Sequence, residues 1–119
     1  MRRLGRLAAS SEEFSAMTSS EVFLYLTTRG HRSGQPHEIE IWFVRQYSAY
    51  YIVSEKGEAA HWVQNLRAQS AVHFYLSNEP SRAAHARVVD EPALIAIIKA
   101  KMDAKYGWSN GLVVEIAPT

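Results

Sequence analysis

The sequence predicts a single α+β domain, a mostly antiparallel β-barrel of six strands with three helices. Most of its apolar segments alternate between apolar and polar residues, which is the period of a β-strand. Short turns join most of these segments, whereas a doubly wound sheet needs a helix after nearly every strand. A length of 119 residues suits one domain covering the whole chain, residues 1–119, without a linker or repeat.

The sequence of residues 1–28 predicts one helix and one strand. Residues 1–10 are expected to form a loose N-terminal segment. Ser11 and the two glutamates after it resemble a helix start, because acidic residues are favourable in the first turn. Phe14 and Met17 give this short helix a small apolar face. The segment from Val22 to Thr28 is rich in β-branched and aromatic residues and predicts the first strand.

The sequence from His37 to Ala68 predicts two strands and a helix. The segment from His37 to Arg45 alternates, with Ile39 and Ile41 on one face and charged residues on the other. It is expected to form the second strand, and Tyr50 to Ser54 the third. A helix is expected from Glu58 to Ala68, directly after a lysine–glycine turn.

The C-terminal part predicts a hairpin, a long helix and a final strand. Ala71 to Leu76 and Ala83 to Val89 are the two hairpin strands, separated by a Ser-Asn-Glu-Pro turn. Pro92 stands in the first turn of a helix whose apolar residues recur at helical spacing. Gly107 ends this helix, and Leu112 to Ile116 is the sixth strand.

Composition and missing motifs exclude several kinds of partner and of functional site. A formal net charge of +1 gives no electrostatic reason to expect a nucleic-acid partner. The chain has no cysteine, which excludes disulfides, thiolate metal sites and a cysteine nucleophile and suits a cytoplasmic protein. No apolar run approaches the roughly 20 residues that a membrane span needs. The sequence also lacks a nucleophile elbow, a Walker loop and a Gly-x-Gly-x-x-Gly motif.

Two loops carry groups that could bind an anion. The loop from Arg29 to Pro36 combines two glycines with two arginines, a histidine and a serine, which offer donors to oxyanions. The Lys56-Gly57 turn opens a helix, whose first N–H groups have no partner within the helix. The alternatives are a solvated hairpin loop and an ordinary capped helix. Both loops lie at strand ends, so together they could present cations to one anionic ligand.

Two further groups of residues are open to two interpretations. Glu38, Glu40, His73, His85 and Arg87 share a polar sheet face, and could bind a metal or form a charged network at an interface or in water. No compact ligand motif is present, so we expect no metal site. At the end of the long helix, Tyr106 and Trp108 either cover a flat ligand or pack against the barrel.

Together these segments resemble the deazaflavin-dependent nitroreductase family, within the pyridoxamine-phosphate-oxidase-like split β-barrels. The matching pieces are Leu-Thr-Thr-Arg-Gly-His-Arg-Ser-Gly-Gln-Pro from Leu26, Tyr-Ile-Val-Ser-Glu-Lys-Gly from Tyr51, His-Trp-Val-Gln-Asn-Leu-Arg from His61, and Val-Val-Glu-Ile-Ala-Pro from Val113. The likeness spans most of the chain from Val22 onward.

The resemblance implies a split barrel, often a homodimer, that binds the deazaflavin coenzyme F-420 or a flavin. It places the phosphate-bearing tail near the glycine loop and the Lys-Gly turn, and substrate-side aromatics on the second strand and after the last helix. The cofactor-binding residues are then expected to be His31, Arg32, Ser33, Gly34, Ile41, Ser54, Lys56, Gly57, Trp62 and Asn65. The substrate-binding residues are expected to be Trp42, Tyr106 and Trp108.

The expected activity is hydride transfer from reduced F-420 to a small electron-poor acceptor such as a quinone, enone or nitro compound. The cofactor supplies the chemistry, so we expect binding residues and no assigned catalytic acid, with Tyr106 as a candidate proton donor. His31 replaces a cation of the family loop, so the charge of the loop depends on pH near neutrality. The alternatives are an FMN-binding reductase, a non-catalytic flavin or deazaflavin binder, and an interaction domain with an empty pocket.

Overall fold

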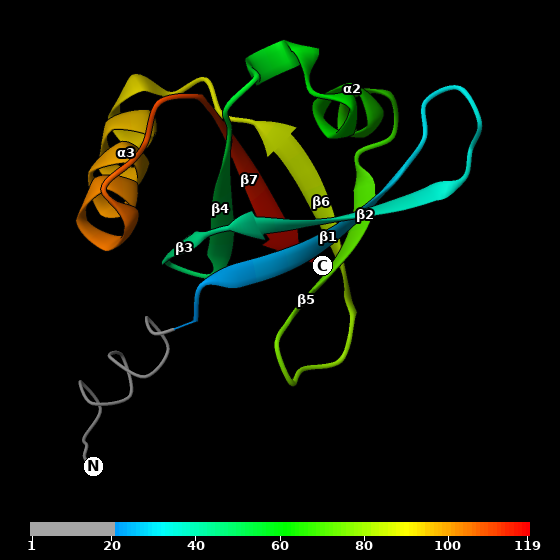
Figure 1. Cartoon of the computed structure of the whole chain (residues 1–119), viewed down its shortest axis with the longest axis horizontal. Coiled ribbons are helices and arrows are strands. Elements are labelled where there is room, and N and C mark those ends of the chain that lie inside the picture. Colours follow the sequence, from blue (N-terminus) through cyan, green and yellow to red (C-terminus); the bar gives the residue numbers. More distant parts are fainter. Residues whose placement is uncertain (1–20) are drawn as a thin grey trace.

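The computed structural model describes residues 21–119, so the predicted loose N-terminal segment and the helix expected after Ser11 lie outside the described residues. The described part is one antiparallel sheet with two α-helices (Figure 1). The strands are β1 (Phe23–Arg29), β2 (Pro36–Trp42), β3 (Val44–Gln46), β4 (Ala49–Ser54), β5 (Ala71–Leu76), β6 (Arg82–Val88) and β7 (Leu112–Pro118). Their order across the sheet is β2-β1-β5-β6-β7-β4-β3.

The prediction of six strands is wrong by one, because the segment from His37 to Arg45 is broken at Phe43 into β2 and β3. These two strands lie at opposite ends of the sheet order, since β2 pairs with β1 while β3 pairs with β4. The chain can pass directly from one end to the other only because the sheet curls round. Phe43 is 1% exposed and packs in the core at this crossing point. The fold is therefore a curled half-barrel.

Both helices predicted after Val22 are present, and the third predicted helix lies outside the described residues. The described residues contain α2 (His61–Ala68) and α3 (Pro92–Tyr106), preceded in the case of α2 by a 3-10 turn, η1 (Gly57–Ala59). The predicted start of α2 at Glu58 is three residues too early, because Ala60 has extended backbone angles between η1 and α2. Gly107 ends α3 as predicted, with φ of 72°.

Two apolar clusters hold the two sides of the sheet. The inner cluster fills the half-barrel with residues such as Leu24, Leu26 and Ile52, and α2 adds Leu66 to it. The outer cluster lies between α3 and the strands β3, β4 and β7. Figure 1 shows α3 on the β3–β4 side of the sheet and α2 near the opposite end of β4. No helix among residues 21–119 is long and apolar enough to cross a membrane.

Candidate functional site

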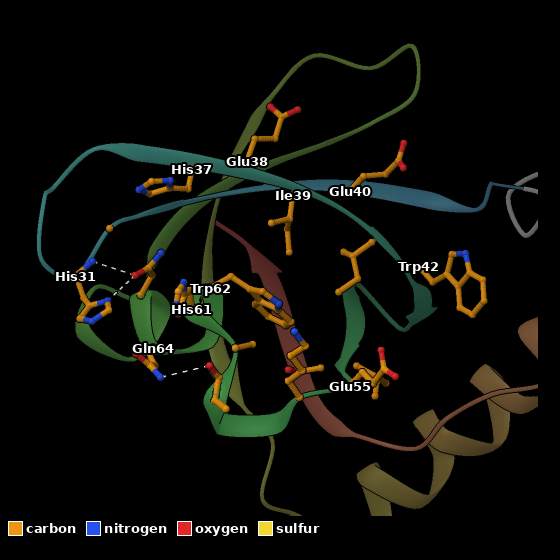
Figure 2. Close-up of a pocket in the computed structure, with 18 of the residues that line it drawn as sticks. His31, His37, Glu38, Ile39, Glu40, Trp42, Glu55, His61, Trp62 and Gln64 are labelled. Atoms are coloured by element: carbon orange, nitrogen blue, oxygen red, sulfur yellow. Dashed lines mark hydrogen bonds between the residues drawn. The ribbon is translucent and has the colours of Figure 1, made fainter.

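The half-barrel opens into one large pocket of about 1270 Å³, lined by β2, the end of β4, η1, α2 and the loop between β1 and β2. Figure 2 shows Ile39 of β2 on one side of this space and Trp62 of α2 on the other. The two edges of the curled sheet do not pair with each other here. The pocket therefore lies where the barrel is left open.

The structure brings most of the predicted site residues to this pocket. Its lining includes His31, Arg32, Ser33, Ile41, Trp42, Ser54, Lys56, Trp62, Asn65 and Trp108. The lining leaves out Gly34, Gly57 and Tyr106. Gly34 and Gly57 have φ values of 73° and 60°, a region that favours glycine, so their contribution is the shape of the two turns.

The β1–β2 loop is held in a closed shape by its own backbone. The Gly30 N–H donates to the Gln35 carbonyl at 2.8 Å, and the Gly34 N–H donates to the Gly30 carbonyl at 2.8 Å. The Gln35 N–H also donates to the Ser33 hydroxyl at 3.1 Å. Within residues 21–119, the exposed Arg32 guanidinium has neither an ion pair nor a hydrogen bond, so its charge is available to a ligand.

The turn after β4 presents a second cation. The buried Ser54 hydroxyl donates to the Gly57 carbonyl at 3.0 Å, and the Ala59 N–H donates to the Lys56 carbonyl at 3.1 Å. These bonds fix the turn while the Lys56 side chain stays exposed and makes no hydrogen bond or ion pair in the described part of the chain. By contrast, the Arg67 guanidinium pairs with Glu58 at 2.8 Å. Lys56 and Arg32 are thus the lysine and arginine that line the pocket.

A buried amide joins α2 to the loop. Asn65 is 4% exposed and its Oδ1 accepts hydrogen bonds from the His31 N–H at 2.9 Å and from the His31 ring Nδ1 at 2.8 Å. The Asn65 Nδ2 donates to the hydroxyl of Thr28, which is 1% exposed, at 3.1 Å. Figure 2 shows both bonds reaching His31. Asn65 therefore holds both the backbone and the ring of His31, which lines the pocket.

Sequence reasoning missed several lining residues, of which His37 and Ile39 are the clearest. Both lie on β2, four and two residues before Ile41, and the alternation of a strand puts these three on one face. A Cβ added to Gly30 would lie 3.0 Å from the His37 Nε2, so the His37 ring packs against the loop. The same-face spacing from Ile41 was the signal that could have found them. Gln64 and Met102 are further lining residues that the sequence did not single out.

Aromatic rings form the end of the pocket near α3. The Trp42 and Tyr106 rings are stacked at 4.6 Å with an interplanar angle of 2°, and Trp108 meets Trp42 edge-on at 6.4 Å. Trp42 and Trp108 line the pocket, while Tyr106 backs them from behind. The arrangement gives the pocket an aromatic surface made of two rings set at 66° to each other.

The Tyr106 hydroxyl is occupied by backbone groups. It donates to the Phe43 carbonyl at 2.6 Å, accepts from the Phe43 N–H at 3.1 Å, and lies 3.0 Å from the Val22 carbonyl. Burial also raises the pKa of this phenol, which makes it a weaker acid. The Lys105 ammonium, whose pKa burial lowers, donates to the carbonyls of Glu21 and Phe43. The end of α3 is thus hydrogen-bonded to the backbone of Phe43, where the chain passes from β2 to β3.

Removing the Tyr106 hydroxyl should therefore loosen this crossing. We expect Tyr106→Phe to lower the free energy of unfolding by about 1–3 kcal/mol, because the Phe43 N–H loses its partner. Urea denaturation measures the change. Tyr47→Phe is the matched control, since Tyr47 is 90% exposed, and it should leave the stability unchanged. Equal stabilities for the two variants would show that the hydroxyl contacts contribute nothing.

The predicted polar face does not gather into one site. The Tyr25 hydroxyl donates to Glu40 at 2.8 Å and the Tyr75 hydroxyl donates to Glu38 at 3.0 Å. Figure 2 shows both glutamates directed to the opposite side of β2 from Ile39. Arg87 instead pairs with Glu115 at 2.9 Å and with Glu91 at 3.1 Å. Arg87 is thus paired separately from Glu38 and Glu40, which are also among the residues that line the pocket.

Comparison with known proteins gives a family match and several structural neighbours. The family model described as F420H(2)-dependent quinone reductase matches residues 7–107. No curated protein sequence matches the chain.

Among solved structures, the conserved hypothetical protein Rv2991 from Mycobacterium tuberculosis has a TM-score of 0.73 at 18% identity, covering 99% of this chain and 86% of that one. HutZ, the heme storage protein from Vibrio cholerae, has a TM-score of 0.72 at 17% identity, with 91% and 89% covered. An F420-H2 dependent reductase (FDR-A) has a TM-score of 0.58 at 20% identity, with 79% and 92% covered. At these identities the neighbours show a shared fold.

Proposed function

Since the chain belongs to the F420H(2)-dependent quinone reductase family, we propose that it transfers a hydride from reduced coenzyme F-420 to an electron-poor acceptor, such as a quinone, an enone or a nitro compound. The family match makes the chain a deazaflavin-dependent reductase whose cofactor is F-420. The observation that carries the proposal is the pocket itself. Its lining combines two exposed cations, Arg32 and Lys56, with the tryptophans Trp42 and Trp108, which meet edge-on.

The lining residues fit a long ligand with a flat ring and an acidic tail. A pocket of about 1270 Å³ is larger than the 300–1000 Å³ typical of small-molecule sites. Arg32 and Lys56 supply charge for a phosphate or carboxylate. Ile39, Ile41 and Trp62 supply half-buried apolar surface in the same lining. The donor set and the apolar surface both suit F-420.

When bound, reduced F-420 supplies the hydride, and the residues of the chain bind, align and shield it. Arg32, Ser33 and Lys56 hold the acidic tail in the proposed arrangement. The backbone of β2 around Ile41 would line the ring, and Trp62 would support it from α2. Trp42 and Trp108 form the surface against which a flat acceptor lies. This placement brings the acceptor next to the ring and excludes water from one side.

We assign Tyr106 a structural role in place of proton donation. Its hydroxyl is bonded to the backbone of Phe43, and its ring lies behind Trp42. The proton that completes reduction of the acceptor then comes from solvent, which reaches the open side of the pocket. The homodimer and the cytoplasmic location stay predictions.

Turnover tests the proposal. Purified protein is mixed with reduced F-420 and menadione or a nitro dye, and reappearance of the oxidised-cofactor absorbance is followed. We expect oxidation that depends on both protein and acceptor. Saturable F-420 binding without turnover would instead indicate the non-catalytic binder. Tight FMN binding with FMN-dependent turnover would indicate the FMN-binding reductase.

A further inference from the structure

His31 is held in one protonation pattern by the amide of Asn65. A backbone N–H can only donate a hydrogen bond, so the Asn65 atom 2.9 Å from the His31 N–H must be the amide oxygen. The same oxygen lies 2.8 Å from the His31 Nδ1. An oxygen that accepts can be contacted by Nδ1 only when Nδ1 carries a proton. The neutral His31 ring is therefore the Nδ1–H tautomer.

The burial of the partners makes this arrangement stable. Asn65 and Thr28 are 4% and 1% exposed, and a buried amide is costly unless it is hydrogen-bonded. Asn65 uses its oxygen twice on His31 and its nitrogen once on Thr28. Rotating the amide would place its NH₂ group against the His31 N–H. The backbone of the loop therefore also fixes the orientation of the amide.

The ring nitrogen Nε2 is then the only position at which His31 can gain a proton. Within residues 21–119 this nitrogen makes no hydrogen bond, and His31 is exposed at the pocket. Protonation leaves the Nδ1–H bond to Asn65 in place, so the loop keeps its shape while Nε2 becomes a charged donor. Histidine side chains ordinarily change charge between about pH 5 and 8.

We propose that Asn65 is a positioning residue that presents the His31 Nε2 to the pocket as a pH-dependent donor for the acidic tail of the cofactor. This rests on the proposed binding of F-420. In the neutral form Nε2 can only accept a hydrogen bond, which an anionic oxygen cannot provide. In the protonated form it donates a charge-assisted bond. The affinity of the pocket for an acidic ligand therefore rises as the pH falls.

Other charged groups in the pocket also affect its affinity for an acidic ligand. Those that share the lining with His31 come from its own loop, β2, the turn after β4, and α2: Arg32, His37, Glu38, Glu40, Glu55, Lys56 and His61. Glu38 and Glu40 are bonded to Tyr75 and Tyr25. His37 and His61 carry imidazoles too, so a variant of His31 alone is needed to isolate its contribution.

The tautomer is tested directly by NMR, without any ligand. Long-range ¹H–¹⁵N spectra of the protein at pH 8 should show one histidine, absent from His31→Gln, with a protonated Nδ1 and an unprotonated Nε2. Asn65→Asp should keep this pattern, because a carboxylate also accepts, whereas Asn65→Leu should give a mixture of tautomers. An Nε2–H pattern in the wild type would overturn the proposal. The wild type and Asn65→Asp decide the matter even where Asn65→Leu does not fold.

The pH dependence is tested by calorimetric titration with oxidised F-420 between pH 5.5 and 8. The ratio of the wild-type affinity to that of His31→Gln should rise about tenfold toward pH 5.5, the effect of one charge-assisted bond. Using the ratio removes the titration of the ligand and of the other histidines. His85→Gln is the control, since His85 lies on β6 outside the pocket lining, and its profile should match the wild type.

The two hypotheses fail in different ways. A flat ratio with F-420 still bound would overturn the His31 proposal and leave the proposed function standing. Absence of F-420 binding at every pH would instead overturn the proposed function, and the NMR tautomer would still decide the positioning role of Asn65.

Discussion

The double variant Arg32→Ala, Lys56→Ala should bind F-420 about a hundredfold more weakly than the wild type, and each single variant about tenfold more weakly. Both side chains are exposed at the pocket and make no bond to another described residue, so their charge is free for the ligand. Their loss removes both the arginine and the lysine from the pocket lining. The same exposure predicts that the fold is kept, which circular dichroism and urea denaturation can check.

Isothermal titration calorimetry with oxidised F-420 measures the effect. Lys99→Ala is the matched control, because it removes the same charge from α3 at a position that is not in the pocket lining. It should bind F-420 as the wild type does. If the double variant kept wild-type affinity, the acidic tail would not be bound by these two cations. A loss in Lys99→Ala equal to that in each single variant would point to net charge alone.

Gly111→Ala should destabilise the protein by about 2–4 kcal/mol and weaken cofactor binding with it. A Cβ at this position would lie 2.3 Å from the Ser54 carbonyl oxygen and 2.8 Å from the Val53 Cγ1. The first of these atoms is backbone in β4, paired with β7 next to Gly111, so it cannot rotate away. Strands β4 and β7 must then move apart at this point, and the movement of Ser54 displaces the Lys56 turn that follows it.

Asn110→Ala serves as the control for Gly111→Ala. Asn110 is the preceding residue and is exposed, so its replacement should change the free energy of unfolding by less than about 0.5 kcal/mol. Urea denaturation of both variants gives the comparison. A Gly111→Ala protein as stable as the Asn110→Ala protein would mean that β4 and β7 do not approach as closely as described.

Local patterns predicted most strands but could not show where one strand must break. Ile39, Ile41 and Phe43 continue one alternation, and all three contribute to the inner cluster. The break at Phe43 follows from pairing at the two ends of the sheet, which is a long-range property. The start of α2 was misplaced for a related reason, because η1 carries ordinary helix-forming residues.

The site shows the same division between local and long-range information. Glycine turns and cations singled out Arg32 and Lys56, and the structure places both in the pocket lining, since both follow strand ends that the topology brings together. The ring of Tyr106 was expected on the substrate side, yet the curl of the sheet places Phe43 against its hydroxyl. The role of Asn65 depends on two partners more than 30 residues away in sequence, and no local pattern reports them.

The central claim, that this pocket is the F-420 site, is tested most directly by the fluorescence of the chain's own tryptophans. All three tryptophans, Trp42, Trp62 and Trp108, line the pocket. Titration with oxidised F-420 should quench their emission saturably with one ligand per chain, and the Arg32→Ala, Lys56→Ala double variant should need far higher concentrations. FMN, titrated in parallel, should quench more weakly. Saturable quenching by FMN with no saturable response to F-420 would contradict the account.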